Sequence, residues 1–134
     1  MRKVLVVMFV SVVALTACSK SDENNTESNT LRGKVIGKWF IDKERKSNSY
    51  QYNNNGTAEY INYYQGKKEV YSGIWKLTQE DVLLEYYPEE GESIPQNWEK
   101  EPDIAHKVIA VDAETMQLQS IDRPKDINTY YRSK

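Results

Sequence analysis

After residue 30 the chain consists of short segments in which apolar and polar side chains alternate. A two-residue period places the apolar side chains on one face of a β-strand. The same part of the chain has no segment of helical length with apolar residues at a 3.6-residue spacing. Residues that form turns, such as Asn54-Asn55-Gly56 and Arg123-Pro124-Lys125, separate the segments. This pattern predicts an all-β domain.

The alternating segments predict eight consecutive strands: 34–43, 48–53, 57–65, 68–77, 81–87, 103–111, 115–121 and 126–132. Because most of the links are short, neighbouring strands are expected to pair antiparallel in an up-and-down meander. Closing such a meander into a barrel removes exposed sheet edges. An eight-stranded barrel has an interior wide enough for side chains or for one small ligand. We therefore expect a small closed β-barrel, with a flattened β-sandwich of the same strands as the alternative.

The tyrosines of the second and third predicted strands indicate how these two strands pair. Asn54-Asn55-Gly56 between them is a strong hairpin signal. A three-residue loop that ends with Gly56 in a left-handed conformation sets Tyr50 opposite Tyr60. Tyr52 then lies opposite Ala58. A two-residue loop is the alternative, but it does not pair the tyrosines, so we expect the three-residue loop.

The first 17 residues resemble a secretory signal peptide. Arg2 and Lys3 precede a mostly apolar stretch at residues 4–15. This stretch is shorter than the roughly 20 residues that span a hydrocarbon core. Leu15-Thr16-Ala17-Cys18 then resembles a bacterial lipobox, a signal in which a peptidase cuts before the cysteine and the cysteine is lipidated. We expect residues 1–17 to be removed and Cys18 to carry a lipid anchor.

The residues that follow the lipobox predict where the protein is located. Residues 18–30 contain no apolar side chain after Cys18 and are rich in Ser, Asn, Thr and acid, so they predict a flexible tether. The tether would join the lipid to a folded domain at residues 31–134. Ser19 does not resemble an inner-membrane retention signal. We therefore expect a membrane-anchored lipoprotein of the cell envelope at the outer membrane, on its periplasmic face or exposed at the surface.

Charge and residue types argue against several classes of function. Without Arg2 and Lys3, the 18 basic residues fall to 16 against 20 acidic residues, which gives a net charge of −4. No basic stripe is present, so we expect no nucleic-acid partner. Cys18 is the only cysteine and His106 the only histidine, which excludes an intramolecular disulfide and a Cys/His zinc site. With no nucleophile elbow or phosphate loop, we expect no enzymatic activity, no cofactor and no metal.

One connection is much longer than the others. Residues 88–102 carry five glutamates against one lysine and contain Trp98. A structureless link of this length is uncommon in a compact domain and is often functional. It would be either a lid over the barrel mouth, with Trp98 touching a ligand, or a solvated loop whose tryptophan packs on the barrel wall.

The sequence also resembles a known family. Gly37-Lys38-Trp39 is similar to the Gly-X-Trp signature of lipocalins. Residues 31–134 further resemble the short lipocalin-like domains of bacterial envelope lipoproteins through Tyr52, Asn55-Gly56-Thr57, Gly73, Trp75 and Tyr130-Tyr131-Arg132. The resemblance implies that Trp39 lies at the closed end of the barrel and that Arg132 packs across it, a contact worth about 0.5–2 kcal/mol. Unlike larger lipocalins, this chain is expected to have no helix that packs on the barrel.

Two functions are compatible with these sequence features. The first is binding of a small hydrophobic or aromatic ligand at the end opposite Trp39, for which strand alternation and the long loop give Tyr60, Tyr71, Trp75, Tyr86, Trp98, Met116 and Leu118 as candidates. Each of these side chains has core or wall packing as its alternative role. The second is a structural or interaction module with a filled barrel. Its outer aromatics, such as Tyr63 and Tyr87, would contact another envelope protein or a glycan.

Overall fold

The structure of the protein is a computed structural model that describes residues 29–134. The predicted signal peptide, Cys18 and the tether as far as residue 28 lie outside the described residues. Within residues 29–134, no helix has the length and apolar character needed to cross a membrane.

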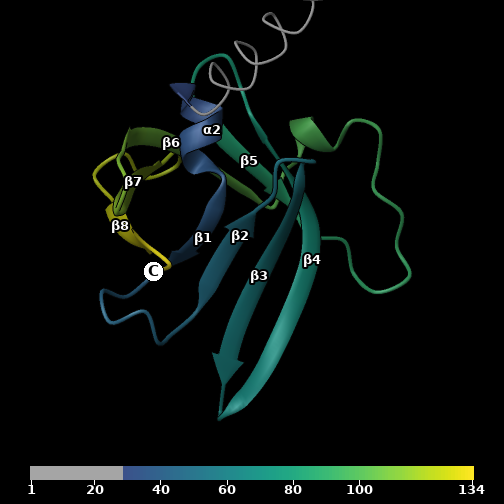
Figure 1. The fold of residues 1–134 in the computed structure, drawn as a ribbon. Helices are drawn as coiled ribbons and strands as arrows, with labels where there is room; N and C mark the ends of the chain where they lie inside the picture. Colours follow the sequence, from purple (N-terminus) through teal and green to yellow (C-terminus); the bar gives the residue numbers. More distant parts are fainter. Residues whose placement is uncertain (1–28) are drawn as a thin grey trace, which may run out of the picture.

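The described residues form a closed barrel of eight strands (Figure 1). Each strand pairs antiparallel with the next, and the last pairs with the first. This confirms the predicted meander and its closure, and the sandwich alternative is wrong. The strands are β1 (Gly37–Phe40), β2 (Ser49–Tyr52), β3 (Thr57–Tyr64), β4 (Lys67–Leu77), β5 (Val82–Tyr86), β6 (Ile104–Val111), β7 (Thr115–Ser120) and β8 (Ile127–Arg132).

The register predicted for the first hairpin is confirmed. Tyr50 lies opposite Tyr60, and Tyr52 lies opposite Ala58. Gly56 has a φ of 86°, as the three-residue loop requires. Strands β3 and β4 pair over their whole common length and extend beyond the other strands as a projecting hairpin (Figure 1).

A short helix, α2 (Leu31–Val35), corrects two predictions. Residues 34–36 were expected in the first strand, and no helix was expected on the barrel, but α2 lies across one end of it (Figure 1). Thr30 caps the helix by accepting a hydrogen bond from the Gly33 N–H at 3.1 Å. The helix has five residues, which is too few to show a helical period in the sequence. Val35, at its C-terminus, is completely buried.

Trp39 and Arg132 bind the carbonyl groups at the end of α2. The Trp39 indole Nε1 donates to the Val35 oxygen at 2.8 Å. The Arg132 guanidinium donates to the oxygens of Lys34 and Ile36 at 2.6 and 3.0 Å. It also lies 4.2 Å from the centroid of the Trp39 ring, which is the stacking that the lipocalin resemblance implies. These donors satisfy helix-terminal carbonyls that would otherwise lack partners.

Gly37 allows this close approach of Arg132 to the helix. Its φ of 136° is a value that residues with a side chain rarely adopt. A Cβ atom at this position would also lie 2.7 Å from Arg132 Nη1. The Gly-X-Trp motif therefore supplies both the backbone turn and the space for the arginine.

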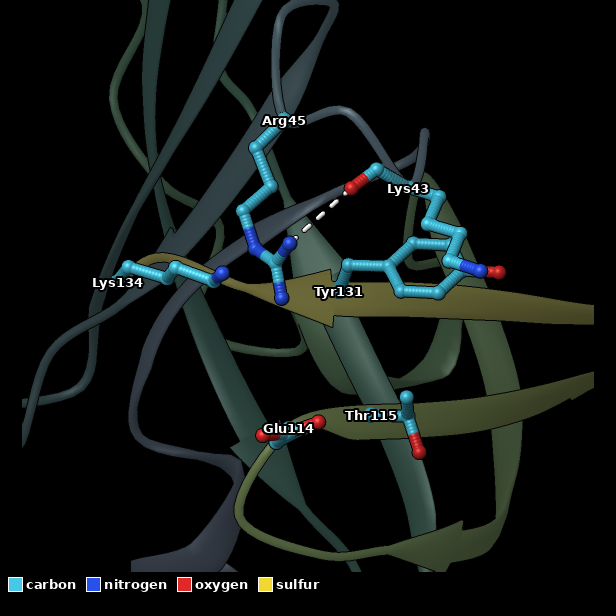
Figure 2. Close-up of a pocket in the computed structure, with 6 residues that line it drawn as sticks. All are labelled: Lys43, Arg45, Glu114, Thr115, Tyr131 and Lys134. Carbon is cyan, nitrogen blue, oxygen red and sulfur yellow. Dashed lines mark hydrogen bonds between the residues drawn. The ribbon is translucent and has the colours of Figure 1, made fainter.

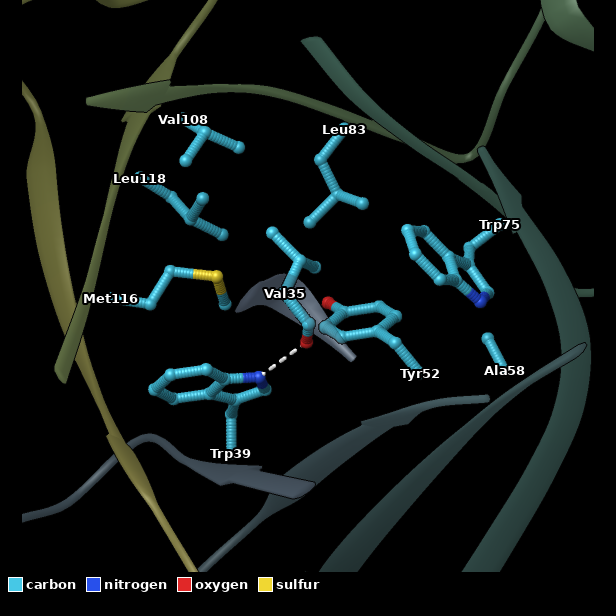
Figure 3. Close-up of a cluster of buried hydrophobic side chains, with 9 residues drawn as sticks. All are labelled: Val35, Trp39, Tyr52, Ala58, Trp75, Leu83, Val108, Met116 and Leu118. Carbon is cyan, nitrogen blue, oxygen red and sulfur yellow. Dashed lines mark hydrogen bonds between the residues drawn. The ribbon is translucent and has the colours of Figure 1, made fainter. Parts of the chain in front are cut away.

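The half of the barrel beneath α2 is filled by side chains. Its core, drawn in Figure 3, contains Val35, Trp39, Tyr52, Ala58, Trp75, Leu83, Val108, Met116 and Leu118. All of these residues are at most 6% exposed. No ligand can therefore enter this half without displacing the core.

Strand β5 faces the opposite way from the prediction. Tyr86 was expected inside the barrel as a ligand residue, but Glu85 pairs with the core residue Trp75, so the odd-numbered residues face inward. Leu83 is completely buried and Glu85 is 1% exposed. Because Val82, Leu83 and Leu84 are all apolar, the sequence allows either face of this strand to point inward. Glutamate is usually exposed, so the sequence alone favours the orientation in which Glu85 points outward.

Candidate functional site

A ladder of aromatic rings leads from the filled core to the other end of the barrel. Successive ring centroids from Trp75 through Tyr52, Tyr50 and Tyr60 to Tyr71 are 5.4, 6.4, 4.6 and 5.8 Å apart. The tyrosine pairs are nearly parallel, with interplanar angles of 6–22°. The ladder follows from the strand register, which places Tyr50, Tyr60 and Tyr71 side by side.

The ladder ends at a hollow of about 290 Å³, hereafter the tyrosine hollow. It is lined by Tyr60, Asn62, Tyr71, Tyr87 and Asp103. Tyr60 has its hydroxyl 3.2 Å from the Asn48 amide, and Tyr71 donates its hydroxyl to Glu69 at 2.9 Å. The Asp103 carboxylate accepts the Tyr87 backbone N–H at 2.7 Å. These contacts fix both the rings and the acid at the mouth of the barrel.

Glu85 lies inside the barrel behind Tyr87. The Tyr87 hydroxyl donates to Glu85 Oε1 at 2.7 Å. Burial raises the pKa of Glu85 to about 7, although hydrogen bonds from Tyr87 and Tyr52 act in the opposite direction. Around neutral pH this carboxyl group is therefore close to its midpoint of ionisation.

Four phenols surround the Glu85 carboxyl group. Burial, followed by the charge of Glu85, raises the pKa of Tyr50, Tyr52, Tyr87 and Tyr130 above the ordinary value for tyrosine. The Tyr130 ring meets Tyr50 edge to face at 6.1 Å. These phenols therefore stay protonated at neutral pH, and two of them, Tyr87 and Tyr52, hydrogen-bond the carboxyl group.

Gly73 makes room for Tyr87 beside Glu85. A Cβ atom at Gly73 would lie 2.6 Å from the Tyr87 ring and would collide with the Tyr86 carbonyl oxygen. The Tyr87 ring can therefore pack directly over the backbone of β4. Tyr87 was predicted as an outer aromatic and instead belongs to the interior.

The predicted ligand residues are divided among three places. Tyr60 and Tyr71 line the tyrosine hollow. Trp75, Met116 and Leu118 are buried in the core, and Trp75 lies near α2, with Arg32 stacked 4.9 Å from its ring centroid. The expectation that Trp75 lies at the end opposite Trp39 is therefore wrong. The two remaining residues, Tyr86 and Trp98, lie outside the barrel.

The end of the long loop that carries Trp98 packs on the barrel wall rather than over the mouth, whereas residues 89–97 are exposed. Trp98 begins a short 3₁₀ helix, η1 (Trp98–Lys100), and its ring lies 6.4 Å from that of Tyr86 on the outer face of β5. Lys76, on the outer face of β4, forms a 2.8 Å ion pair with Glu99 of the same loop. The wall-packing alternative is confirmed, and the lid alternative is wrong.

Sequence reasoning missed Glu85, Tyr87 and Asp103 as parts of the site. A register argument could have found the first two. Trp75 and Leu77 face inward on β4, and the three-residue turn at 79–81 keeps odd-numbered residues on that face. Asp103 comes directly before β6 and is placed by its backbone hydrogen bond to the Glu85 oxygen, which has no signal in the sequence.

A second hollow, of about 440 Å³, lies beside the end of β8 (Figure 2). Its lining is Lys43, Arg45, Glu114, Thr115, Tyr131 and Lys134. Arg45 already donates to the backbone oxygens of Arg132 and Lys43, at 2.6 and 3.1 Å. The acid Glu114 reduces the positive charge of this surface. Because its arginine is committed to the backbone, this hollow is a weaker candidate site.

A third hollow marks a gap in the barrel wall. β1 pairs with β8 only at Trp39–Arg132 and Phe40–Tyr131. Beyond Phe40, a hollow of about 360 Å³ is lined by Ile41, Asn128, Thr129 and Tyr130.

Among residues 29–134, no group of three or more His, Cys, Asp or Glu side chains is arranged to hold a metal ion.

The closed eight-stranded meander, with a Gly-X-Trp motif and an arginine at its closed end, defines a lipocalin-like β-barrel. Two solved structures illustrate the similarity of this chain to known barrels. One is a lipocalin-like protein from Bacteroides uniformis ATCC 8492, with a TM-score of 0.55 and 14% identity, covering 75% of this chain and 99% of that protein. The other is an uncharacterized protein from Bacteroides eggerthii DSM 20697, with a TM-score of 0.50 and 15% identity, covering 74% and 99%.

At this level of identity the likeness shows the fold alone. Comparison with known protein families finds no match. Comparison with curated proteins also finds no match.

Proposed function

We propose that this protein is a non-enzymatic lipoprotein of the cell envelope that binds a small hydrophobic or aromatic ligand in the tyrosine hollow. The observation that carries the proposal is the group of three tyrosines, Tyr60, Tyr71 and Tyr87, around one hollow at the open end of the barrel. Tyrosine rings offer flat apolar surfaces, and their hydroxyl groups remain available for hydrogen bonds.

The size of the hollow limits the ligand. Its volume of about 290 Å³ is at the lower end of the roughly 300–1,000 Å³ of ordinary ligand pockets. The core residues beneath it are at most 6% exposed, so a long acyl chain could not enter that half without displacing them. The ligand is therefore expected to be a small compound that stacks on the rings at the mouth.

Replacing Tyr60 with leucine tests the binding site. The ring of Tyr60 stacks between Tyr50 and Tyr71, so its loss removes the central stacking surface of the hollow. We expect compounds that bind the wild-type protein to bind Tyr60→Leu about 3- to 10-fold more weakly. The measurement is a ligand-observed NMR screen with small aromatic and hydrophobic compounds, followed by titration of the compounds that bind.

Tyr63→Leu is the matched control, because Tyr63 belongs to the same strand but is 51% exposed on the outer face. It should leave the affinities unchanged. Equal weakening by both variants, or a screen in which no compound binds, would contradict the proposed site.

The membrane anchor has its own test. Cys18→Ala removes the only thiol that can accept the lipid. We expect the variant to keep its signal peptide, to incorporate no labelled fatty acid and to be lost from the outer-membrane fraction. Normal lipid labelling of this variant would refute the lipoprotein proposal.

The projecting β3–β4 hairpin favours a second candidate function. Tyr63, Tyr64 and Val70 are 51%, 62% and 50% exposed on this hairpin. Exposed aromatics of this kind are enriched at protein interfaces. An interaction module that contacts another envelope protein or a glycan through the hairpin is therefore the alternative. Binding in the screen that depends on Tyr63 rather than on Tyr60 would support it.

A further inference from the structure

We propose that the tyrosine hollow selects a small organic cation, such as a substituted ammonium, over a neutral compound of the same shape. This inference rests on the proposed function and names the chemical class of its ligand. It is carried by the arrangement of acidic groups and ring faces around the hollow.

Acidic groups occur on several sides of the hollow without basic partners. Asp103 is part of the lining, Glu69 holds the Tyr71 hydroxyl, and Glu85 holds the Tyr87 hydroxyl. Among the described residues, no lysine or arginine lines the hollow or forms an ion pair with any of these three acids. The potential in the hollow is therefore negative, which attracts a cation and repels an anion.

The hydrogen bonds of the tyrosines favour the same ligand class. The hydroxyl groups of Tyr71 and Tyr87 both donate hydrogen bonds to carboxylates. A phenol that donates to a carboxylate has a more electron-rich ring. Ring faces attract cations through their quadrupole, and aromatic cages use this contact to recognise substituted ammonium groups. A contact of this type changes affinity by about 2- to 30-fold.

Glu85 links the binding of a cation to pH. Because burial raises the pKa of Glu85 to about 7, a nearby cation favours its ionised form and releases its proton. The phenols around Glu85 are those whose pKa is raised by burial and by its charge: Tyr50, Tyr52, Tyr87 and Tyr130. The nearest other titratable groups are Asp103, which accepts the Tyr87 N–H, and His106 on β6, which pairs with Leu83. If binding requires the ionised form, affinity rises about tenfold between pH 6 and 8.

A pair of probes of equal shape separates charge from fit. Choline and its neutral isostere 3,3-dimethylbutan-1-ol would each be titrated into the folded protein and followed by the NMR signals of the Tyr60, Tyr71 and Tyr87 rings. We expect choline to bind at least fivefold more tightly than the alcohol. Asp103→Asn keeps the acceptor for the Tyr87 N–H and should lower the choline affinity several-fold. Glu85→Gln should remove the rise of affinity with pH.

The outcomes separate this inference from the proposed function. If the neutral alcohol binds the hollow as tightly as choline, the cation inference is wrong and the proposed function stands. If neither probe shifts these rings while aromatic compounds do, the cation inference again fails alone. If no compound of any kind binds there, both fail. Tyr63→Leu should leave the choline affinity unchanged.

Discussion

Replacing Glu85 with glutamine is expected to stabilise the protein at pH 8 by about 3 kcal/mol and to leave its stability at pH 4 nearly unchanged. The wild-type carboxyl group has a pKa of about 7 in the folded state, against 4.5 as the ordinary value. Folding therefore favours the protonated form. The stabilisation is complete below pH 4.5 and is lost as the pH rises through 7, because the buried group must then ionise.

The measurement is the free energy of unfolding from urea titrations between pH 4 and 8. The wild-type value should fall relative to that of Glu85→Gln across this interval, mainly between pH 5 and 7.5. Glu80→Gln is the matched control, because it removes the same charge from an exposed turn and should reproduce the wild-type profile. A Glu85→Gln profile parallel to the wild-type profile would show that the carboxyl group is not buried as described.

A buried acid that lowers stability at neutral pH is not explained by the needs of the fold. An apolar side chain of similar volume between Trp75 and Ile104 would fill the same place without the ionisation cost. Hydrogen bonds from Tyr87 and Tyr52 reduce that cost without removing it. Polar groups that reduce stability in this way are concentrated at functional sites. This is consistent with a role for Glu85 in ligand binding.

The sequence carried most of the information needed for the barrel. The bounds of seven strands followed from alternation and turn residues to within one residue, whereas the first strand was predicted three residues too long at each end. Asn54-Asn55-Gly56 was enough to define the β2–β3 register. The helix α2 was missed because its five residues are shorter than any detectable helical period. It is stabilised by contacts to Trp39 and Arg132, and Arg132 comes from the far end of the chain.

The candidate site was less predictable because it depends on which way one strand faces. When β5 presents its other face to the interior, Tyr87 takes the place expected for Tyr86, and Glu85 lies in the interior instead of in solvent. The local sequence allows both orientations, and only the pairing with Trp75 decides between them. Tyr60 and Tyr71 were found because they belong to strands whose register the hairpin loop fixes.

Trp39→Ala is expected to lower the free energy of unfolding by about 3–5 kcal/mol. The indole is completely buried between α2 and the core residues (Figure 3). Its removal leaves a cavity, deprives the Val35 carbonyl of its donor and removes the ring on which Arg132 stacks. The measurement is urea unfolding of the wild type and the variant, followed by far-ultraviolet circular dichroism.

Trp98→Ala makes the same substitution on the outer wall, where the ring contacts Tyr86 and remains partly exposed. This substitution should lower the free energy of unfolding much less than Trp39→Ala does, because the loop can close over the gap and no helix carbonyl loses its hydrogen-bond donor. Because the two substitutions remove the same atoms, a difference between their effects on the free energy of unfolding reports the surroundings of each tryptophan. Equal losses for the two variants would mean that α2 and Trp39 do not close the barrel. A loss confined to Trp39→Ala would show that this end of the barrel is the main source of its stability, which leaves the tyrosine end free to carry the acidic groups of a binding site.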